Sequence, residues 1–80
     1  MKLSVIIPAL NEEGVIGQIL QRVMVINPEE VIVVDGGSRD ATCEISECLG
    51  CFVIQSPPGR ALQMNTGAKA AQGDVLLFLH

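Results

Sequence analysis

The apolar residues of this chain fall into two alternating patterns. Short unbroken runs, such as Val31-Ile-Val-Val34, are typical of strands that are buried on both faces. Between these runs, apolar residues recur three or four positions apart, as Ile16, Ile19, Leu20 and Val23 do, which is helical spacing. The expected strands cover residues 3–8, 31–34, 51–55 and 75–79, and the expected helices run from Asn11 to Asn27, from Ser38 to Gly50 and over 60–72.

This order of elements, βαβαβαβ, predicts an α/β protein with a parallel sheet that carries helices on both faces. Right-handed crossovers are expected. The 80 residues contain no internal repeat or linker, and they make at most one small domain, which buries only about 60% of the surface of its unfolded chain. Because no helix follows the last expected strand, the sequence predicts the N-terminal piece of a larger α/β domain.

Local signals suggest how the helices begin and pack. Asn11 and Ser38 each stand before a helical segment, and both residue types are preferred N-caps, so each is expected to cap a helix. The third helix is rich in alanine and is expected to pack closely on its neighbour through a thin apolar face. That face consists of Met64, Ala68 and Ala71.

Composition and charge narrow the class of partner. The chain is 49% hydrophobic and 18% charged, which is typical of a globular protein. Its net charge of −4 argues against a nucleic-acid backbone or an anionic membrane surface as the main partner. No signal peptide is visible, and no apolar run approaches the ~20 residues of a membrane span. A cytoplasmic protein is expected, and peripheral membrane association through further segments stays open.

The cysteines fit a reducing compartment, since Cys43, Cys48 and Cys51 are an odd number. Cys48 and Cys51 have the C-x-x-C spacing of redox and metal-binding motifs. A redox pair opens a helix, however, and this pair lies where a helical segment closes at Gly50. A zinc site would need a second ligand pair, and only His80 is at hand. The pair is therefore expected to be structural.

Polar residues concentrate at the ends of the expected strands. In an open parallel sheet, ligands bind beyond the carboxyl ends of the strands, where the strand order reverses. The four ends carry Pro8-Ala-Leu-Asn-Glu12, Asp35-Gly-Gly-Ser38, Ser56-Pro-Pro-Gly-Arg60 and His80. Carboxylates accept hydrogen bonds from a base or ribose, while glycine amides and an arginine hold a diphosphate. Each loop alone also fits a cap or a tight turn, but four at one edge favour a nucleotide site.

Two common nucleotide motifs do not occur. A dinucleotide site requires G-x-G-x-x-G after the first strand, and that loop is Pro8-Ala-Leu-Asn-Glu-Glu13 here. No Walker sequence is present either. The first loop is therefore better suited to border a base than to cradle phosphates.

Three longer motifs occur in a recognisable order and spacing. They are Leu3-Ser-Val-Ile-Ile-Pro-Ala-Leu-Asn-Glu-Glu13, Val31-Ile-Val-Val-Asp-Gly-Gly-Ser-Arg-Asp-Ala-Thr42, and Asn65-Thr-Gly67 followed by Ala71-Gln-Gly-Asp-Val-Leu-Leu-Phe-Leu79. Together they resemble the family 2 glycosyltransferases over all 80 residues. The resemblance implies a GT-A (Rossmann-like) fold and a hexosyltransferase. Such an enzyme binds a nucleoside-diphosphate sugar with Mg²⁺ or Mn²⁺ and passes the sugar to an acceptor with inversion.

The resemblance also assigns a nucleotide-sugar site to residues of this chain. These residues are Pro8, Ala9, Leu10, Glu12, Asp35, Gly36 and Arg60. The first four would border the nucleoside, and Arg60 lies in the loop that approaches the base or the diphosphate. Asp35 and Gly36 stand at an aspartate pair that many members use against the base. Gly36 replaces the second acid, so base recognition would rest on Asp35 or on backbone groups.

The metal and the catalytic base are expected mostly outside these residues. His80 occupies the first acid of the family's D-x-D metal motif and is the candidate metal ligand of the chain. The second metal aspartate would follow two residues later, and the base that deprotonates the acceptor lies further downstream. The 80 residues would thus be a partial domain that binds the nucleotide, ends at the metal motif and transfers no sugar alone.

Within the family, Pro58-Gly-Arg-Ala-Leu-Gln-Met-Asn-Thr-Gly67 and the ending Phe78-Leu-His80 resemble a bacterial subgroup associated with arsenosugar biosynthesis and radical-SAM genes. Two alternatives from other classes stay open. One is a non-catalytic α/β nucleotide-binding module, which would leave the hydrophobic strand 75–79 as an edge. The other is a nucleotidyltransferase that forms sugar nucleotides, which would want a glycine-rich, basic loop after the first strand.

Overall fold

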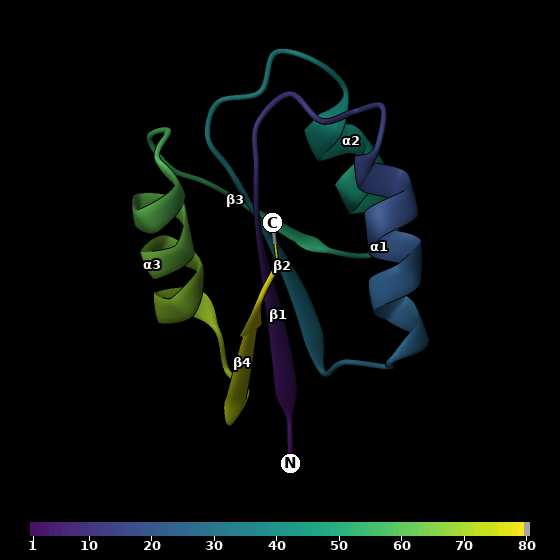
Figure 1. Cartoon of the computed structure of the whole chain (residues 1–80), viewed down its shortest axis with the longest axis vertical. Coiled ribbons are helices and arrows are strands. Elements are labelled where there is room, and N and C mark those ends of the chain that lie inside the picture. Colours follow the sequence, from purple (N-terminus) through teal and green to yellow (C-terminus); the bar gives the residue numbers. More distant parts are fainter. Residues whose placement is uncertain (80) are drawn as a thin grey trace.

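The computed structural model describes residues 1–79, which form four strands and three helices in strict alternation (Figure 1). The strands are β1 (Leu3–Ala9), β2 (Glu30–Asp35), β3 (Phe52–Gln55) and β4 (Val75–Phe78), and the helices are α1 (Ile16–Val25), α2 (Thr42–Cys48) and α3 (Arg60–Ala70). This order confirms the predicted α/β architecture.

All three strand pairings are parallel, and the order across the sheet is β3-β2-β1-β4. The chain places β1, β2 and β3 side by side in one direction. It then returns through α3 to place β4 against the other edge of β1, with Leu3 opposite Val75. The strand order therefore reverses at β1, and the carboxyl end of β1 is the place where this topology favours a ligand site.

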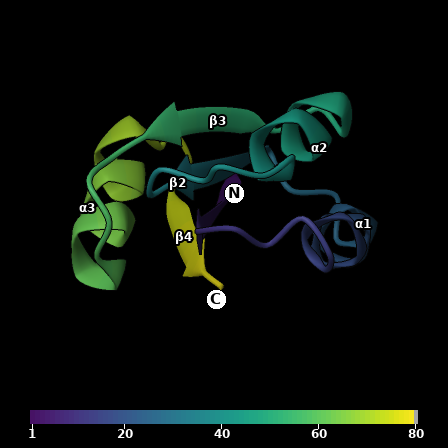
Figure 2. The same ribbon diagram turned by 90° about the horizontal axis from the view of Figure 1, so that it is seen from above.

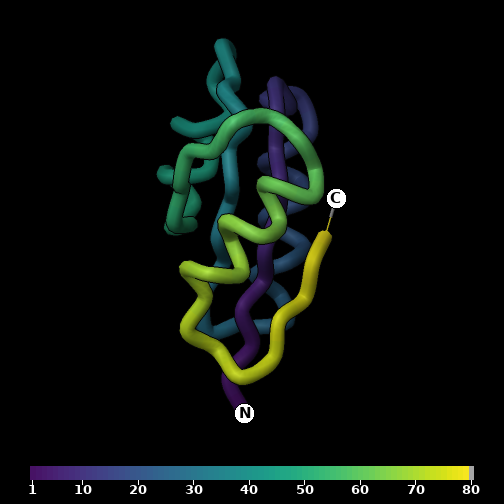
Figure 3. The backbone as a smooth tube through the Cα atoms, turned by 90° about the vertical axis from the view of Figure 1, so that its left-hand side faces the viewer, coloured from purple at the N-terminus to yellow at the C-terminus, as the bar shows by residue number. Residues whose placement is uncertain are grey.

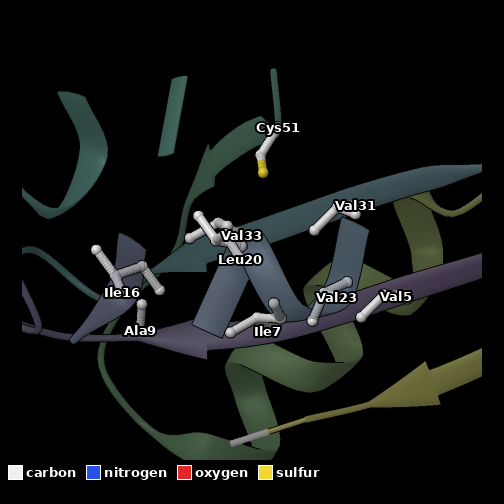
Figure 4. Close-up of a cluster of buried hydrophobic side chains, with 9 residues drawn as sticks. All are labelled: Val5, Ile7, Ala9, Ile16, Leu20, Val23, Val31, Val33 and Cys51. Atoms are coloured by element: carbon white, nitrogen blue, oxygen red, sulfur yellow. The ribbon is translucent and has the colours of Figure 1, made fainter. Parts of the chain in front are cut away.

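Helices cover both faces of the sheet, with α1 and α2 on one side and α3 on the other (Figure 2). The larger core lies under α1 and α2 (Figure 4), and it comprises Val5, Ile7, Ala9, Ile16, Leu20, Val23, Val31, Val33 and Cys51. The smaller core lies under α3 and comprises Ile6, Ile32 and Val34, with Ala68 and Ala71 packed on it. Because successive strand residues point to opposite faces, β1 and β2 need apolar residues at every central position.

Helix α3 packs closely on the sheet, as predicted, through two of the three predicted residues and through two buried residues that were not predicted. Ala68 and Ala71 contact the smaller core, whereas the buried residues of the helix are Gln63 and Gly67. A Cβ atom on Gly67 would lie 2.5 Å from Cγ2 of Ile6 and within 2.9 Å of the neighbouring strand's valine. Only glycine at this position lets α3 lie so near the sheet.

A polar cluster ties the start of β4 to the amino-terminal ends of β1 and β2. The Ser4 hydroxyl donates to the Glu30 carboxylate at 2.6 Å and accepts the Gly73 N–H at 2.9 Å. The same Glu30 oxygen accepts the Gln72 N–H at 2.5 Å. Figure 3 shows this connection turning beside the N-terminus. Because Gln72 is held there, α3 ends at Ala70 rather than at the predicted residue 72.

The predicted helix starts were wrong. Helix α1 begins at Ile16 instead of directly after Asn11, and α2 begins at Thr42 instead of directly after Ser38. Neither helix has a side-chain cap at its N-terminus. Asn11 has a positive φ of 52°, which belongs to a turn. Both residues make contacts between loops, which are described with the site below.

The remaining features concern the cysteines and the outer strand. Cys48 is the last residue of α2, so the C-x-x-C pair does close a helix, and Cys51 is buried. The four residues of β4 are each between 37% and 40% exposed. None of the helices within residues 1–79 has the length and apolar character that a membrane crossing requires.

Candidate functional site

A cavity of about 250 Å³ opens at the carboxyl end of β1, where the strand order reverses. The loop after β1 forms one wall, and the first turn of α3 forms the other. The residues that line the cavity are Pro8, Ala9, Leu10, Glu12, Gly59, Arg60 and Gln63. The position is the one that parallel α/β sheets use for ligands.

The cavity brings together five of the seven residues predicted to bind a nucleotide sugar, namely Pro8, Ala9, Leu10, Glu12 and Arg60. These residues come from two segments about fifty positions apart in the chain, which the return of α3 across the sheet places side by side. Gly59 and Gln63 complete the lining, and the sequence analysis did not single out either of them.

The two walls of the cavity differ in character. Pro8, Ala9 and the half-exposed Leu10 make an apolar surface on the side of β1. On the other side, Arg60 lines the cavity and is the first residue of α3, so a cationic residue and a helix N-terminus lie at the same wall. An apolar wall that faces a cation and a helix N-terminus suits a ligand with an aromatic part and an anionic part.

Gln63 links the segments that form the floor of this cavity. Its side chain is only 5% exposed. Its Nε2 donates to the carbonyl of Val34 at 2.8 Å and to that of Ala9 at 3.1 Å, and its Oε1 accepts the Gly59 N–H at 3.1 Å. One carboxamide thus joins the ends of β1 and β2 to the loop before α3. The sequence carried no distinct signal for it, because Gln63 is one of several polar residues in α3.

Gly36 lies behind Gln63 and does not line the cavity. Its backbone N–H donates to the Ala9 carbonyl at 2.9 Å. A Cβ atom at this position would come within 3.0 to 3.2 Å of three atoms of the Gln63 carboxamide. The space beside residue 36 is therefore occupied by a side chain from α3.

Asp35 ends β2 and is 1% exposed. Its carboxylate accepts the backbone N–H groups of Gly37 at 3.0 Å and Ser38 at 2.8 Å, and it also accepts the Ser38 hydroxyl. Burial raises the pKa of Asp35, but the hydrogen bonds from Ser38 and Gly37 outweigh burial and hold that pKa below its ordinary value. The carboxylate organises its own loop, and a contact with the nucleoside stays a prediction.

The loops after β1 and β2 are bonded to each other. The Asn11 N–H donates to the Ser38 hydroxyl at 2.8 Å, and the Arg39 N–H donates to Oδ1 of Asn11 at 2.8 Å. The Glu12 N–H donates to Oγ1 of Thr42, also at 2.8 Å. The side chains of Asn11 and Ser38 make hydrogen bonds between the two loops instead of capping helices. The predicted caps were wrong for this reason. The pairing fixes the loop that carries the apolar wall.

A divalent metal does not find its ligands within the described residues. His80, the predicted ligand, lies outside them. Residues 1–79 hold no group of three or more His, Cys, Asp or Glu side chains placed to bind a metal ion.

The fold and the cavity define an α/β domain with a cavity at the point where a parallel sheet reverses its strand order. The family model described as "Glycosyl transferase family 2" matches residues 4–80, and the chain belongs to this family. The predicted family is thereby confirmed.

The chain is similar to proteins that are longer than itself. An uncharacterized protein of Methanocaldococcus jannaschii is 36% identical over 72 residues, which cover 88% of this chain and 30% of that protein. Glucosyl-3-phosphoglycerate synthase from Mycobacterium tuberculosis, in a crystal structure with Mn²⁺, UDP and glucosyl-3-phosphoglycerate, is 29% identical with a TM-score of 0.84. That match covers 98% of this chain and 32% of the synthase.

Two further crystal structures of the same synthase, one with Mg²⁺ and UDP and one with Mn²⁺ and UDP-glucose, match with the same identity, coverage and TM-score. The predicted GT-A fold is confirmed by these matches. The chain spans about a third of the length of these relatives.

Proposed function

We propose that this chain is the nucleotide-binding portion of a nucleotide-sugar-dependent glycosyltransferase, which uses Mg²⁺ or Mn²⁺ and transfers a hexose with inversion. The observation that carries the proposal is the cavity in which the end of β1 faces Arg60 at the N-terminus of α3. Membership in glycosyl transferase family 2 supports it. The similar synthase from M. tuberculosis, whose structures hold UDP, UDP-glucose and either metal ion, supports it too.

Each wall of the cavity has a role in this proposal. The apolar surface of Pro8, Ala9 and Leu10 packs against the nucleoside, and the Glu12 carboxylate accepts hydrogen bonds from the ribose or the base. Arg60 and the first-turn amides of α3 hold the diphosphate. Asp35 contributes to the recognition of the nucleoside, and its carboxylate also holds the loop after β2 in place.

In this proposal, residues 1–79 bind and orient the donor, and the transfer itself depends on residues outside them. The described residues offer neither a metal site nor a base at the cavity besides Glu12. We therefore expect the purified 80-residue chain to transfer no sugar from any nucleotide sugar. Detectable turnover by that chain would contradict this expectation.

A binding experiment tests the role of the cavity. In the complete protein, Arg60→Ala is expected to weaken the binding of UDP, GDP or dTDP with MnCl₂ by about tenfold or more, measured by isothermal titration calorimetry. Lys69→Ala is the matched control, because Lys69 is a cation in the last turn of the same helix. Equal affinities of the two variants, or no binding of any of the three diphosphates by the parent protein, would overturn the proposal.

An activity assay separates the alternatives. A glycosyltransferase consumes a nucleotide sugar and releases a nucleoside diphosphate, whereas a sugar-nucleotide-forming nucleotidyltransferase consumes a nucleoside triphosphate and releases pyrophosphate. A non-catalytic module binds the nucleotide and releases neither product. Measuring both products with the complete protein distinguishes the three.

The run of residues 58–67 supports a finer proposal, namely membership in the arsenosugar-associated bacterial subgroup. Three residues of that run, Gly59, Arg60 and Gln63, line the cavity, so the part of the chain that resembles the subgroup is also part of the proposed donor site. A cytoplasmic location is proposed as well, and the three free cysteines support it.

A further inference from the structure

We propose that Gln63 is a positioning residue of the nucleotide pocket, and that residue 36 is a glycine because the Gln63 carboxamide occupies the space of its side chain. The inference rests on the proposed function, since the pocket is the proposed nucleotide site. It concerns a side chain inside α3 and its neighbour directly after β2, and the effect on the ligand passes through Gly59 to Arg60 at the start of α3.

The hydrogen bonds of Gln63 join three parts of the pocket. The side-chain amide donates at 2.8 Å to the carbonyl of Val34, the last but one residue of β2, and at 3.1 Å to that of Ala9, the last residue of β1. The side-chain oxygen accepts the backbone N–H of Gly59 at 3.1 Å. Two strand ends and the entry of α3 are thus held at fixed separations by one planar group.

Glutamine suits this position better than any similar side chain. The position requires two donors and one acceptor on a group long enough to reach from α3 to both strands, and a carboxamide supplies them. A glutamate would bring an oxygen against two carbonyl oxygens, and a methionine of similar length would make none of the three bonds. In residues 1–79 no buried side-chain nitrogen or oxygen lacks a hydrogen-bond partner. Loss of the carboxamide would take one hydrogen-bond partner from each of three backbone groups, those of Val34, Ala9 and Gly59.

Gly36 is required by space and not by backbone conformation. Its φ is not among the positive values in the chain, which occur at Gly37, Gly50 and Gly59 among the glycines. A Cβ on residue 36 would nevertheless lie 3.0 Å from Oε1, 3.1 Å from Cδ and 3.2 Å from Nε2 of Gln63. These distances are shorter than ordinary van der Waals contacts. A side chain at 36 therefore requires the carboxamide at 63 to shift by a few tenths of an ångström, and the three hydrogen bonds of that carboxamide oppose the shift.

The bond to Gly59 links Gln63 to the ligand. Gly59 has a φ of 142°, a conformation that other residues rarely adopt, and it immediately precedes Arg60. The hydrogen bond to Gln63 holds Gly59 in this conformation, and the direction of the chain at Gly59 sets where Arg60 leaves the backbone. Gln63 therefore places the cation that the proposed diphosphate meets.

A double-mutant cycle on ligand affinity tests the positioning role in the complete protein, with UDP, GDP and dTDP in the presence of MnCl₂ as probes. Gln63→Met is expected to weaken binding of the preferred diphosphate by about tenfold. In an Arg60→Ala background, the same change is expected to weaken it by less than about threefold, because the residue that Gln63 places is then gone. Thr66→Val is the control, since Thr66 makes a side-chain bond to a carbonyl in the same helix and does not line the cavity.

The outcomes separate this inference from the proposed function. Unchanged affinity in Gln63→Met, or equal loss with and without Arg60, would overturn the positioning role while the nucleotide site stands. If the parent protein binds none of the three diphosphates, the proposed function and the positioning role fall together.

A second cycle, on stability, tests the steric pair without any ligand. Gly36→Ala is expected to lower the melting temperature clearly in the parent protein but little in a Gln63→Ala background, where the carboxamide no longer occupies the space. Thermal unfolding followed by circular dichroism gives all four values. An equal loss from Gly36→Ala in both backgrounds would overturn the pairing of Gly36 with Gln63.

Discussion

The backbone N–H of Glu12 donates a hydrogen bond of 2.8 Å to the hydroxyl of Thr42, thirty residues further along the chain. Thr42 is fully buried, and its hydroxyl also donates to the Asp40 carboxylate. Glu12 lines the cavity, and Thr42 begins α2. A single hydroxyl therefore connects the wall of the proposed nucleotide site to the helix that follows the neighbouring strand.

Removal of that hydroxyl is expected to destabilise the protein. Thr42→Val keeps the shape but leaves the Glu12 N–H without its acceptor, which costs about 1–3 kcal/mol of unfolding free energy. Urea unfolding of the complete protein measures the loss. Thr42→Ser retains the hydroxyl and loses only a methyl group, so it should stay within about 1 kcal/mol of the parent. A Thr42→Val variant that is no less stable than Thr42→Ser would show that the hydroxyl contributes no more to stability than the methyl group does.

Asp35→Asn tests whether the buried carboxylate at the end of β2 serves the nucleotide. If it acts on the base or ribose, the substitution should weaken nucleoside diphosphate binding by about 1–3 kcal/mol, the range of a charge-assisted hydrogen bond. Ser38→Ala is the control, because it removes the two hydrogen bonds of the Ser38 hydroxyl, one to Asp35 and one from the Asn11 N–H, and leaves the carboxylate charge in place. Calorimetric titration and thermal melts of both variants are compared. A lowered melt with unaltered affinity in Asp35→Asn would assign the carboxylate to the loop alone.

Gly67→Ala is expected to push α3 away from the sheet. The added methyl group would lie 2.5 Å from Ile6 and 2.9 Å from Val34, so overpacking should cost about 1–3 kcal/mol of unfolding free energy. Gly14→Ala is the control, since a Cβ there meets nothing within 4 Å. Denaturant midpoints of the two variants provide the comparison, and a midpoint for Gly67→Ala as high as that for Gly14→Ala would contradict the close approach of the helix.

Stability is expected to fall in acid partly through Glu30. The Gln72 N–H and then the Ser4 hydroxyl hold the pKa of Glu30 below its ordinary value of 4.5. The ionised form is therefore favoured in the folded protein, so its contribution is present above the ordinary pKa and is lost as the pH falls through the lowered one. Glu30→Gln should reduce the slope of unfolding free energy against pH in the acid range. An unchanged slope would show that the cluster at the start of β4 does not depend on this charge.

The outer strand β4 is expected to make the 80-residue chain self-associate. Its four apolar residues are 37% to 40% exposed, and one edge of the strand is unpaired within residues 1–79. Leu77→Lys should shift the sedimentation profile of this chain toward monomer. Val25→Lys adds the same charge to an 83% exposed position on α1 and should not. A soluble parent monomer with a sharp cooperative melt would contradict the expectation.

The elements were predictable because each is signalled by its own residues. The unbroken apolar runs indicated strands. The runs at β1 and β2 supply apolar side chains to the cores on both faces of the sheet. The helix starts were not predictable in the same way. Asn11 and Ser38 have the side chains of caps, but their partners lie 27 and 28 residues away, and a local pattern contains no information on such partners.

The candidate site was predictable where strand ends decide it and not where a helix interior does. Pro8 through Glu12 follow from the rule on carboxyl ends of parallel strands, and the cavity is found there. Gln63 was not predicted as a site residue, because a polar residue in a helix is normally expected to be exposed. Its burial depends on two carbonyls that only the assembled sheet provides. Gly67 escaped for a related reason, since its use is the space that it leaves open.

The pairing of β1 with β4 has a consequence for how the protein is made. Ser4 is hydrogen-bonded to Glu30, which lies 26 residues further along the chain, whereas Lys2 is hydrogen-bonded to Asp74, which lies 72 residues further along. A ribosome that adds about 5–20 residues per second needs about 2–9 seconds to synthesise the stretch between Glu30 and Asp74. During this time β1 has acquired one neighbour and waits for the other, with its second edge open to any strand nearby. The first strand to be synthesised is thus among the last to be enclosed, and chaperone contacts during synthesis are expected to fall on β1.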